Sequence, residues 1–246
     1  MKKNFLLLIL TYGFFCNINA ATLDGTISIV YTNIHNVFNN GQSATGFVKM
    51  DNGFTIRYNA TATINITEAV SGPLDLRTTG TMVLDGDLYL DSNVTLSSSG
   101  YIYGNGNTIF LGGDLEIPDS TDLRFTNSTI IDGQGHNLIL GHRAQLLVDT
   151  FTTLTLKNLI IKNTFNTQAR PAIRCLDWKA KLALDNVEFS LNDDFYFNNG
   201  QMFIYNDFVF TGTSEFVYTS VLPSYITPHS TLYFDKDTSF KYYPST

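Results

Sequence analysis

The sequence is poor in cysteine and in charged residues, and each shortage excludes a class of protein. Its 246 residues contain two cysteines, Cys16 and Cys175, which allow one bridge at most, so a fold held by several disulfides is excluded. Charged residues make up 15% of the chain, below the roughly 25% typical of soluble domains. The formal net charge is −7 and no basic run exceeds Lys2-Lys3. The chain therefore lacks the basic surface of a nucleic-acid-binding protein.

The start of the chain, up to Ala20, is typical of a secretory signal peptide. A short basic head precedes the apolar run "FLLLILTYGFF". This run is much shorter than the roughly 20 apolar residues that a membrane-spanning helix needs. The following "NINA" ends at Ala20, so we predict cleavage between Ala20 and Ala21. No later stretch is apolar enough for a membrane-spanning helix. We expect the chain to be secreted, periplasmic or attached to the cell surface, and the basic start and lack of disulfides favour a bacterial source.

A repeat dominates the middle of the chain. When "GYIYGNGNTIFLGG" (100–113) is placed above "TIIDGQGHNLILGH" (129–142), Ile102 falls on Ile131. The aligned positions keep one offset of about 29 residues, a period within the range of solenoid repeats. A second set of apolar pairs recurs at steps of roughly 28–31 residues; its members are Val94/Leu96, Leu123/Phe125, Leu154/Leu156 and Leu182/Leu184.

Short apolar–polar alternation separated by turn residues predicts several strands in each repeat. A period of this size with several strands is typical of one coil of a solenoid. The sequence therefore predicts an all-β parallel solenoid with coils of about 26–31 residues. We expect Leu123, Leu154 and Leu182 to form one interior column.

Glycine and asparagine mark the expected corners of the coils. Gly104, Gly106, Gly133 and Gly135 are predicted to be structural turns, because they recur at the same place in the two aligned segments. Asparagine follows the second track two residues after its last apolar position and tolerates the left-handed backbone of a sharp turn. We predict that stacked amides form a ladder along the axis; its members are Asn127, Asn158 and Asn186.

The regularity changes along the chain. Residues 21–72 are irregular and are predicted to form an N-terminal cap with irregular strands, because a bare coil end exposes unpaired backbone groups. The parallel β-helix is assigned to residues 73–246 and becomes rich in aromatic residues after Phe189.

Coils that read "IxGxGxxIxLG…LxL…LxLxN" resemble the right-handed parallel β-helix, the pectin-lyase-like architecture of bacterial exported proteins. The resemblance covers roughly residues 73–210 and implies a fold, because function is set by sites grafted on folds. Members of this class include polysaccharide lyases and hydrolases, adhesins and passenger domains.

The catalytic pattern of this class is incomplete in the sequence. Polygalacturonase-like members carry Asn-x-Asp, Asp-Asp, Gly-His-Gly and Arg-x-Lys on successive coils. Here "GQGHN" supplies His136 without the following glycine, Asp193-Asp194 lies some two coils beyond it, and Arg-x-Lys is absent. The candidate catalytic residues are therefore His136, Asp132, Asp193 and Asp194, and the alternative interpretation makes Asp132 and His136 ordinary turn residues.

Pectate-lyase-like members hold calcium with clustered carboxylates. Here "LDGDLYLD" supplies Asp85, Asp87 and Asp91, with Asp114 expected one coil above Asp87. Two interpretations stay open: solvated turns, or a Ca²⁺ site built from hard oxygen ligands. No other cofactor is expected.

Two functions follow from the sequence. The first is an exported non-catalytic β-helix that serves as a structural, adhesive or surface-binding module for a polysaccharide or a host or cell-surface ligand. The alternative is a carbohydrate-active enzyme, a polysaccharide lyase or hydrolase. Trp178, Tyr89, Tyr101 and Tyr103 are candidate sugar-stacking residues, although we expect Trp178 to pack in the interior.

Overall fold

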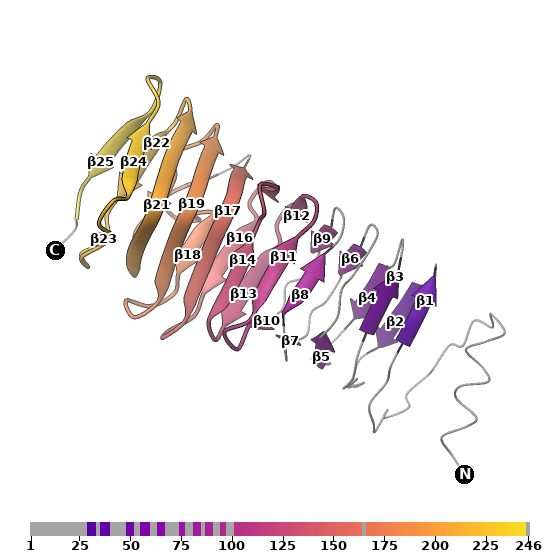
Figure 1. Cartoon of the computed structure of the whole chain (residues 1–246). Coiled ribbons are helices and arrows are strands. Elements are labelled where there is room, and N and C mark those ends of the chain that lie inside the picture. Colours follow the sequence, from indigo (N-terminus) through magenta and orange to yellow (C-terminus); the bar gives the residue numbers. More distant parts are fainter. Residues whose placement is uncertain are drawn as a thin grey trace, which may run out of the picture.

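The computed structural model is an all-β parallel solenoid of about six turns (Figure 1). It describes residues 101–163 and 166–244 throughout. Earlier residues are described as strand segments between 29 and 96, with side chains only at 84 and 87–90. The predicted signal peptide and its cleavage site at Ala20 lie outside the described residues. In the described part, no helix has the length and apolar character needed to cross a membrane.

Each coil visits three parallel sheets, which we call the first, second and third faces. The first face contains β8 (Leu88–Leu90), β11 (Thr108–Leu111), β14 (Thr129–Asp132), the first halves of β17 (Thr153–Asn163), β19 (Lys181–Leu191) and β21 (Gln201–Gly212), and β23 (Tyr225–Ile226). The second face contains β6 (Leu74–Leu76), β9 (Val94–Leu96), β12 (Leu115–Ile117), β15 (Asn137–Leu140), the second halves of β17, β19 and β21, and β24 (Thr231–Phe234).

The third face is built in two stretches. One contains β5 (Thr63–Ile66), β7 (Thr81–Leu84), β10 (Tyr101–Tyr103), β13 (Asp122–Thr126), β16 (Gln145–Val148) and β18 (Ile173–Cys175). The other contains β20 (Phe195–Phe197), β22 (Glu215–Tyr218) and β25 (Ser239–Tyr242). All pairings within the described strands are parallel, so the prediction of a parallel solenoid is confirmed.

Four further described strands lie on the N-terminal side of the stack (Figure 1). β1 (Ile29–Thr32) pairs with β3 (Val48–Asp51), and β2 (His35–Asn39) pairs with β4 (Thr55–Asn59), both in parallel. These strands and β5 belong to the range assigned to the cap, 21–72. The boundary at residue 73 stays a prediction.

The core is a set of continuous apolar columns that run along the axis. On the second face one column passes in register from aliphatic to aromatic residues; its members are Leu115, Leu138, Ile161, Phe189, Phe210 and Phe234. All except Phe234 are at most 2% exposed. Burying one such side chain contributes about 1.5–3 kcal/mol, so the columns hold the coils together without disulfides.

The coil is shorter than the sequence predicts. Ile102 pairs with Phe125, and Phe125 pairs in turn with Val148, so each of these two steps is one coil of about 23 residues. Ile131 lies on the first face in register with Ile109, so it does not stack on Ile102. The predicted offset and the predicted coil length are therefore wrong for these coils, because both are too long.

The predicted column of three leucines is wrong in one of its two steps. Leu123 pairs with Leu146 on the third face, whereas Leu154 lies on the first face in register with Thr129. Leu154 does pair with Leu182, as predicted. This coil is longer than the preceding ones, since β17 ends at Asn163 and β18 begins only at Ile173.

Candidate functional site

The four candidate catalytic residues do not come together. Asp132 ends β14 and His136 lies in the turn before β15, so both occupy the corner between the first and second faces. Asp193 and Asp194 lie between β19 and β20, at the corner between the second and third faces and two coils further along the stack. A shared cleft would need these corners to meet, and the solenoid keeps them apart.

Asp132 and Asp194 hold backbone and side-chain groups of the scaffold. Asp132 Oδ1 accepts hydrogen bonds from the Asn158 side chain at 3.1 Å and from the Gln134 amide at 3.2 Å. Asp194 accepts from the Glu215 amide at 2.9 Å and from the Tyr196 hydroxyl at 3.2 Å. The bonds from Asn158 and Glu215 secure one coil to the next.

The described carboxylates that were proposed to bind calcium also accept hydrogen bonds from the neighbouring coil. Asp87 accepts from the Thr108 amide at 2.8 Å and Asp114 from the Asn137 amide at 2.9 Å, each bond joining neighbouring coils. Partial burial raises the pKa of Asp114, but the hydrogen bonds from Asn137 and the charges of His136 and Lys162 together leave the pKa below its ordinary value. The side chains of Asp85 and Asp91 lie outside the described residues. Among the described side chains, no group of three or more His, Cys, Asp or Glu residues converges as metal ligands would.

Two of the three predicted ladder asparagines lie at one corner. Asn158 and Asn186 have positive φ angles of 49° and 57°. Asn186 donates to Asn158 at 3.0 Å. Asn206, φ 57°, extends this corner by donating to Asp185 at 2.6 Å. Asn127 lies instead at the corner between the third and first faces and donates to Asn105 at 2.9 Å.

At the first of these corners the strands bend between two faces without ending. The left-handed asparagines turn β17, β19 and β21 from the first face to the second. A groove of about 270 Å³ runs beside the corner; it is lined by Gly135, Asn158, Leu159, Ile160, Asn186, Val187, Glu188, Asp207 and Val209.

The four predicted turn glycines serve two different purposes at two different corners. Gly106 and Gly135 have positive φ angles of 82° and 91° and open space around them. A Cβ on Gly104 would overlap Thr129, and one on Gly133 would overlap Leu159. Gly106 and Gly135 are therefore glycines because the backbone has a positive φ, and Gly104 and Gly133 because the next coil lies too close for a side chain.

Exposed aromatic residues lie along the first face and its edge, and the sequence interpretation named only Trp178 and Tyr89 among them. Trp178 is 56% exposed and Phe151 is 74% exposed, so the expectation that Trp178 packs in the interior is wrong. Lys179 Nζ lies 4.8 Å from the Trp178 ring and 4.3 Å from the Phe151 ring. Both rings stand just before the strands of the first face, on neighbouring coils.

More rings continue along the first face. Phe203 stacks on Tyr225 with centroids 5.1 Å apart and lies 6.5 Å from Tyr205. Lys181 Nζ lies 5.5 Å from the Phe203 ring. We call this set the aromatic patch; its members are Phe151, Trp178, Lys179, Lys181, Phe203, Tyr205 and Tyr225.

One outward column of the first face leads to the aromatic patch. In register order it contains Tyr89, Phe110, Asp132, Lys157, Asp185 and Tyr205. Tyr89 and Phe110 are stacked with centroids 4.7 Å apart. Lys157 and Asp185 form an ion pair at 3.8 Å. This face therefore presents rings at both ends and paired charges between them.

The third face carries a different arrangement. Arg124 forms two bonds to Asp149, at 2.8 and 3.1 Å, and lies 5.1 Å above the ring of Tyr101. The Arg124 hydrogen bonds lower the pKa of Asp149.

On the same face, burial raises the pKa of Cys175 to about 12, so this buried thiol stays protonated and unreactive.

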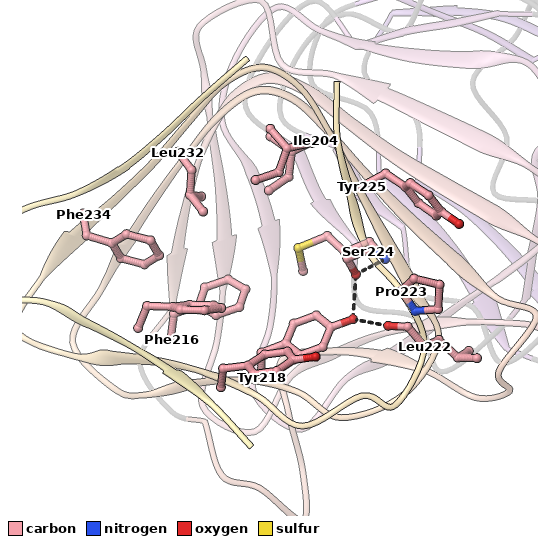
Figure 2. A pocket seen from close by; sticks show the side chains of 13 residues that line it. Ile204, Phe216, Tyr218, Leu222, Pro223, Ser224, Tyr225, Leu232 and Phe234 are labelled. Carbon is pink, nitrogen blue, oxygen red and sulfur yellow. Dashed lines mark hydrogen bonds between the residues drawn. The ribbon is translucent and has the colours of Figure 1, made fainter. Parts of the chain in front are cut away.

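The C-terminal side of the stack holds an apolar recess of about 360 Å³ (Figure 2). Its lining residues are Met202, Ile204, Phe216, Tyr218, Leu222, Pro223, Ser224, Tyr225, Ile226, Leu232, Phe234, Phe240 and Tyr242. The Tyr218 hydroxyl donates to the Leu222 carbonyl and lies 2.7 Å from the Ser224 hydroxyl. None of these lining residues is charged.

Comparison with known proteins adds no assignment. No protein-family model, curated protein or solved structure matches this chain. The site must therefore be interpreted from its own residues.

Proposed function

We propose that this chain is an exported, non-catalytic β-solenoid that binds a polysaccharide or another cell-surface glycan through the aromatic patch. The observation that carries the proposal is the set of exposed rings aligned on successive coils of one face. Burying aromatic side chains would favour folding, so rings such as Trp178 and Phe151, each more than half exposed, indicate a surface kept for contact.

The chemistry of the patch suits a sugar. A pyranose ring has a flat face of C–H groups that packs on an aromatic ring, and its hydroxyl groups accept hydrogen bonds from ammonium groups. Trp178 and Phe151 supply rings, and Lys179 lies between them with its ammonium group near both. The Lys181 ammonium group likewise lies near the Phe203 ring. Each lysine thus places a donor beside a stacking surface.

The spacing of the patch suits a polymer. Successive coils are about 4.8 Å apart, and the patch reaches from the coil of Phe151 to that of Tyr225. It therefore extends about 14 Å along the axis, since these residues lie three coils apart. A repeating ligand can contact several of these rings at once, and weak contacts then add to useful avidity.

A glycan array followed by calorimetry on the best glycan tests the proposal. Trp178→Ala should weaken binding by roughly tenfold or more, because exposed tryptophan anchors contribute at least about 1.4 kcal/mol. Tyr233→Ala is the matched control: Tyr233 is 51% exposed but lies on the second face.

Two results would contradict this function. One is equal affinity of Trp178→Ala and the unaltered chain for every glycan bound. The other is reproducible cleavage of a polysaccharide by the purified chain, which would favour the alternative of a carbohydrate-active enzyme.

A further inference from the structure

Two outward rings lie on the first face at a distance from the aromatic patch. Tyr89 on β8 and Phe110 on β11 are paired in register on neighbouring strands, and their rings stack with centroids 4.7 Å apart (Figure 1). Tyr89 is 45% exposed and Phe110 is partly exposed, so neither ring belongs to the buried core. We call these two residues the aromatic pair.

The aromatic pair is in line with the aromatic patch. The outward column that contains the pair continues in register through Asp132, Lys157 and Asp185 to Tyr205. Phe110 and Tyr205 are four register steps apart, which is about 19 Å at about 4.8 Å per step. Both sets of rings therefore stand on one column of one sheet.

The surface between the two sets of rings is polar and low. Asp132, Lys157 and Asp185 supply carboxylate and ammonium groups, which can bind sugar hydroxyl groups, and the Lys157–Asp185 ion pair balances its own charge. In the neighbouring outward column, Thr155 and Ala183 follow each other in register, and both side chains are small. Charged residues are depleted from the core of protein–protein interfaces, so this surface suits a hydroxyl-rich chain better than an apolar protein face.

Rings occur on almost every coil of this face. Among the first-face strands that the structure describes, from β8 to β23, only β14 has no phenylalanine, tyrosine or tryptophan on it or just before it. Tyr89 and Tyr225 are six register steps apart, which is about 29 Å, about twice the length of the aromatic patch.

We propose that the aromatic pair is a second subsite, and that one unbranched polysaccharide chain lies along the first face and contacts both sets of rings. This inference rests on the proposed function and names its ligand more closely, as a linear polymer longer than the patch. A chain held at the patch is already at a high effective concentration beside the aromatic pair, so the second contact adds to the affinity. A terminal sugar or a short branch reaches one set of rings only.

Calorimetry with linear oligosaccharides of defined length tests the proposal. The probes are unbranched series of glucose, mannose, N-acetylglucosamine and galacturonic acid. Since one pyranose unit is about as long as one step between coils, chains of about three sugars cover the patch and chains of about seven reach Tyr89. Phe110→Ala should weaken binding of the long chain roughly tenfold and that of the short chain less than about twofold. Trp178→Ala should weaken both.

Three controls accompany these variants. Phe110→Tyr keeps a ring and should bind the long chain as the unaltered protein does, and so should Tyr233→Ala, altered on the second face. If Phe110→Ala fails to fold by circular dichroism, Tyr89→Ala replaces it.

The outcomes separate this proposal from the function on which it rests. If Phe110→Ala and Tyr89→Ala bind the long chain normally while Trp178→Ala does not, the aromatic pair only joins two coils and the second subsite is overturned. An equal loss for short and long chains, or binding of branched glycans alone, also overturns it. An unaltered affinity of Trp178→Ala at every length contradicts the proposed function itself.

Discussion

At the residue scale, the corners of the coils depend on glycines, and two of these glycines lack a side chain for different reasons. Gly133 has no side chain because Leu159 of the next coil occupies that space, whereas Gly135 is glycine because its φ of 91° suits no side chain well. The sequence interpretation identified both as turn residues. It could not separate their roles, because the distinction depends on which atoms of the neighbouring coil lie opposite.

We predict that Gly133→Ala destabilises the protein by about 2–3 kcal/mol, because the added methyl group overlaps Leu159 and coil stacking must shift. Gly135→Ala should cost about 1–2 kcal/mol from backbone strain alone. Urea unfolding curves of both variants measure the difference. Equal losses would contradict the assignment of the two roles.

The Asn158 side chain joins two side chains of neighbouring coils at one corner, Asp132 and Asn186, and we predict that Asn158→Leu costs about 2 kcal/mol or more. The variant loses the bonds to Asp132 and Asn186 and must adopt a positive φ of 49°. Asn158→Gly keeps the backbone conformation and loses only the bonds, so it separates the two contributions. An unchanged melting temperature for the leucine variant would show that the amide contacts are dispensable.

The Arg124–Asp149 pair makes part of the stability dependent on pH. Arg124 lowers the pKa of Asp149 in the folded state, so the pair stabilises the fold above the ordinary aspartate pKa of 3.8. That contribution disappears as the pH falls through the lowered value. In melting temperatures between pH 2 and pH 7, Asp149→Asn should show a shallower acid decline than the parent. Parallel curves would mean that the pair contributes nothing.

At the element scale, the sequence predicts strands well and their stacking poorly. The strands of every face have the same apolar–polar alternation, and each strand is followed by a turn. A sequence comparison therefore finds similarity between strands of different faces as readily as between strands of the same face. The offset found in the sequence is longer than the true coil of about 23 residues. The difference is nearly the length of chain that one of the three faces takes up. It superimposes the Gly104–Asn107 corner on the Gly133–His136 corner, although they separate different pairs of faces. Only backbone pairing resolves this ambiguity.

Phe189 is the centre of the aromatic part of the core. Its ring lies 4.8 Å from that of Phe195 and 5.0 Å from that of Phe208. We predict that Phe189→Ala costs about 3–5 kcal/mol, from lost burial and the cavity left behind. Phe151→Ala, at an exposed ring, should change stability by less than about 0.5 kcal/mol. Chemical unfolding of the two variants provides the comparison, and similar losses would contradict the assignment of Phe189 to the core.

At the scale of the whole molecule, the class of fold follows from short alternating runs and turns, whereas the candidate site does not. A parallel solenoid needs only apolar residues at alternate positions, and these can be counted in the sequence. The aromatic patch depends on Trp178 lying at a corner and Phe203 pointing outward, and both follow from the coil register. Since the register was misassigned by one side, the sequence could not show that these residues share a surface.

The connection between β17 and β18 shows that the solenoid tolerates additional residues at one corner of a coil. β17 ends at Asn163 and β18 begins at Ile173, whereas β15 ends at Leu140 and β16 already begins at Gln145. The strands on either side remain paired with their neighbours in the coils before and after. This corner thus accepts additional sequence at little expense to the scaffold. It is the natural position at which to graft a foreign epitope for display.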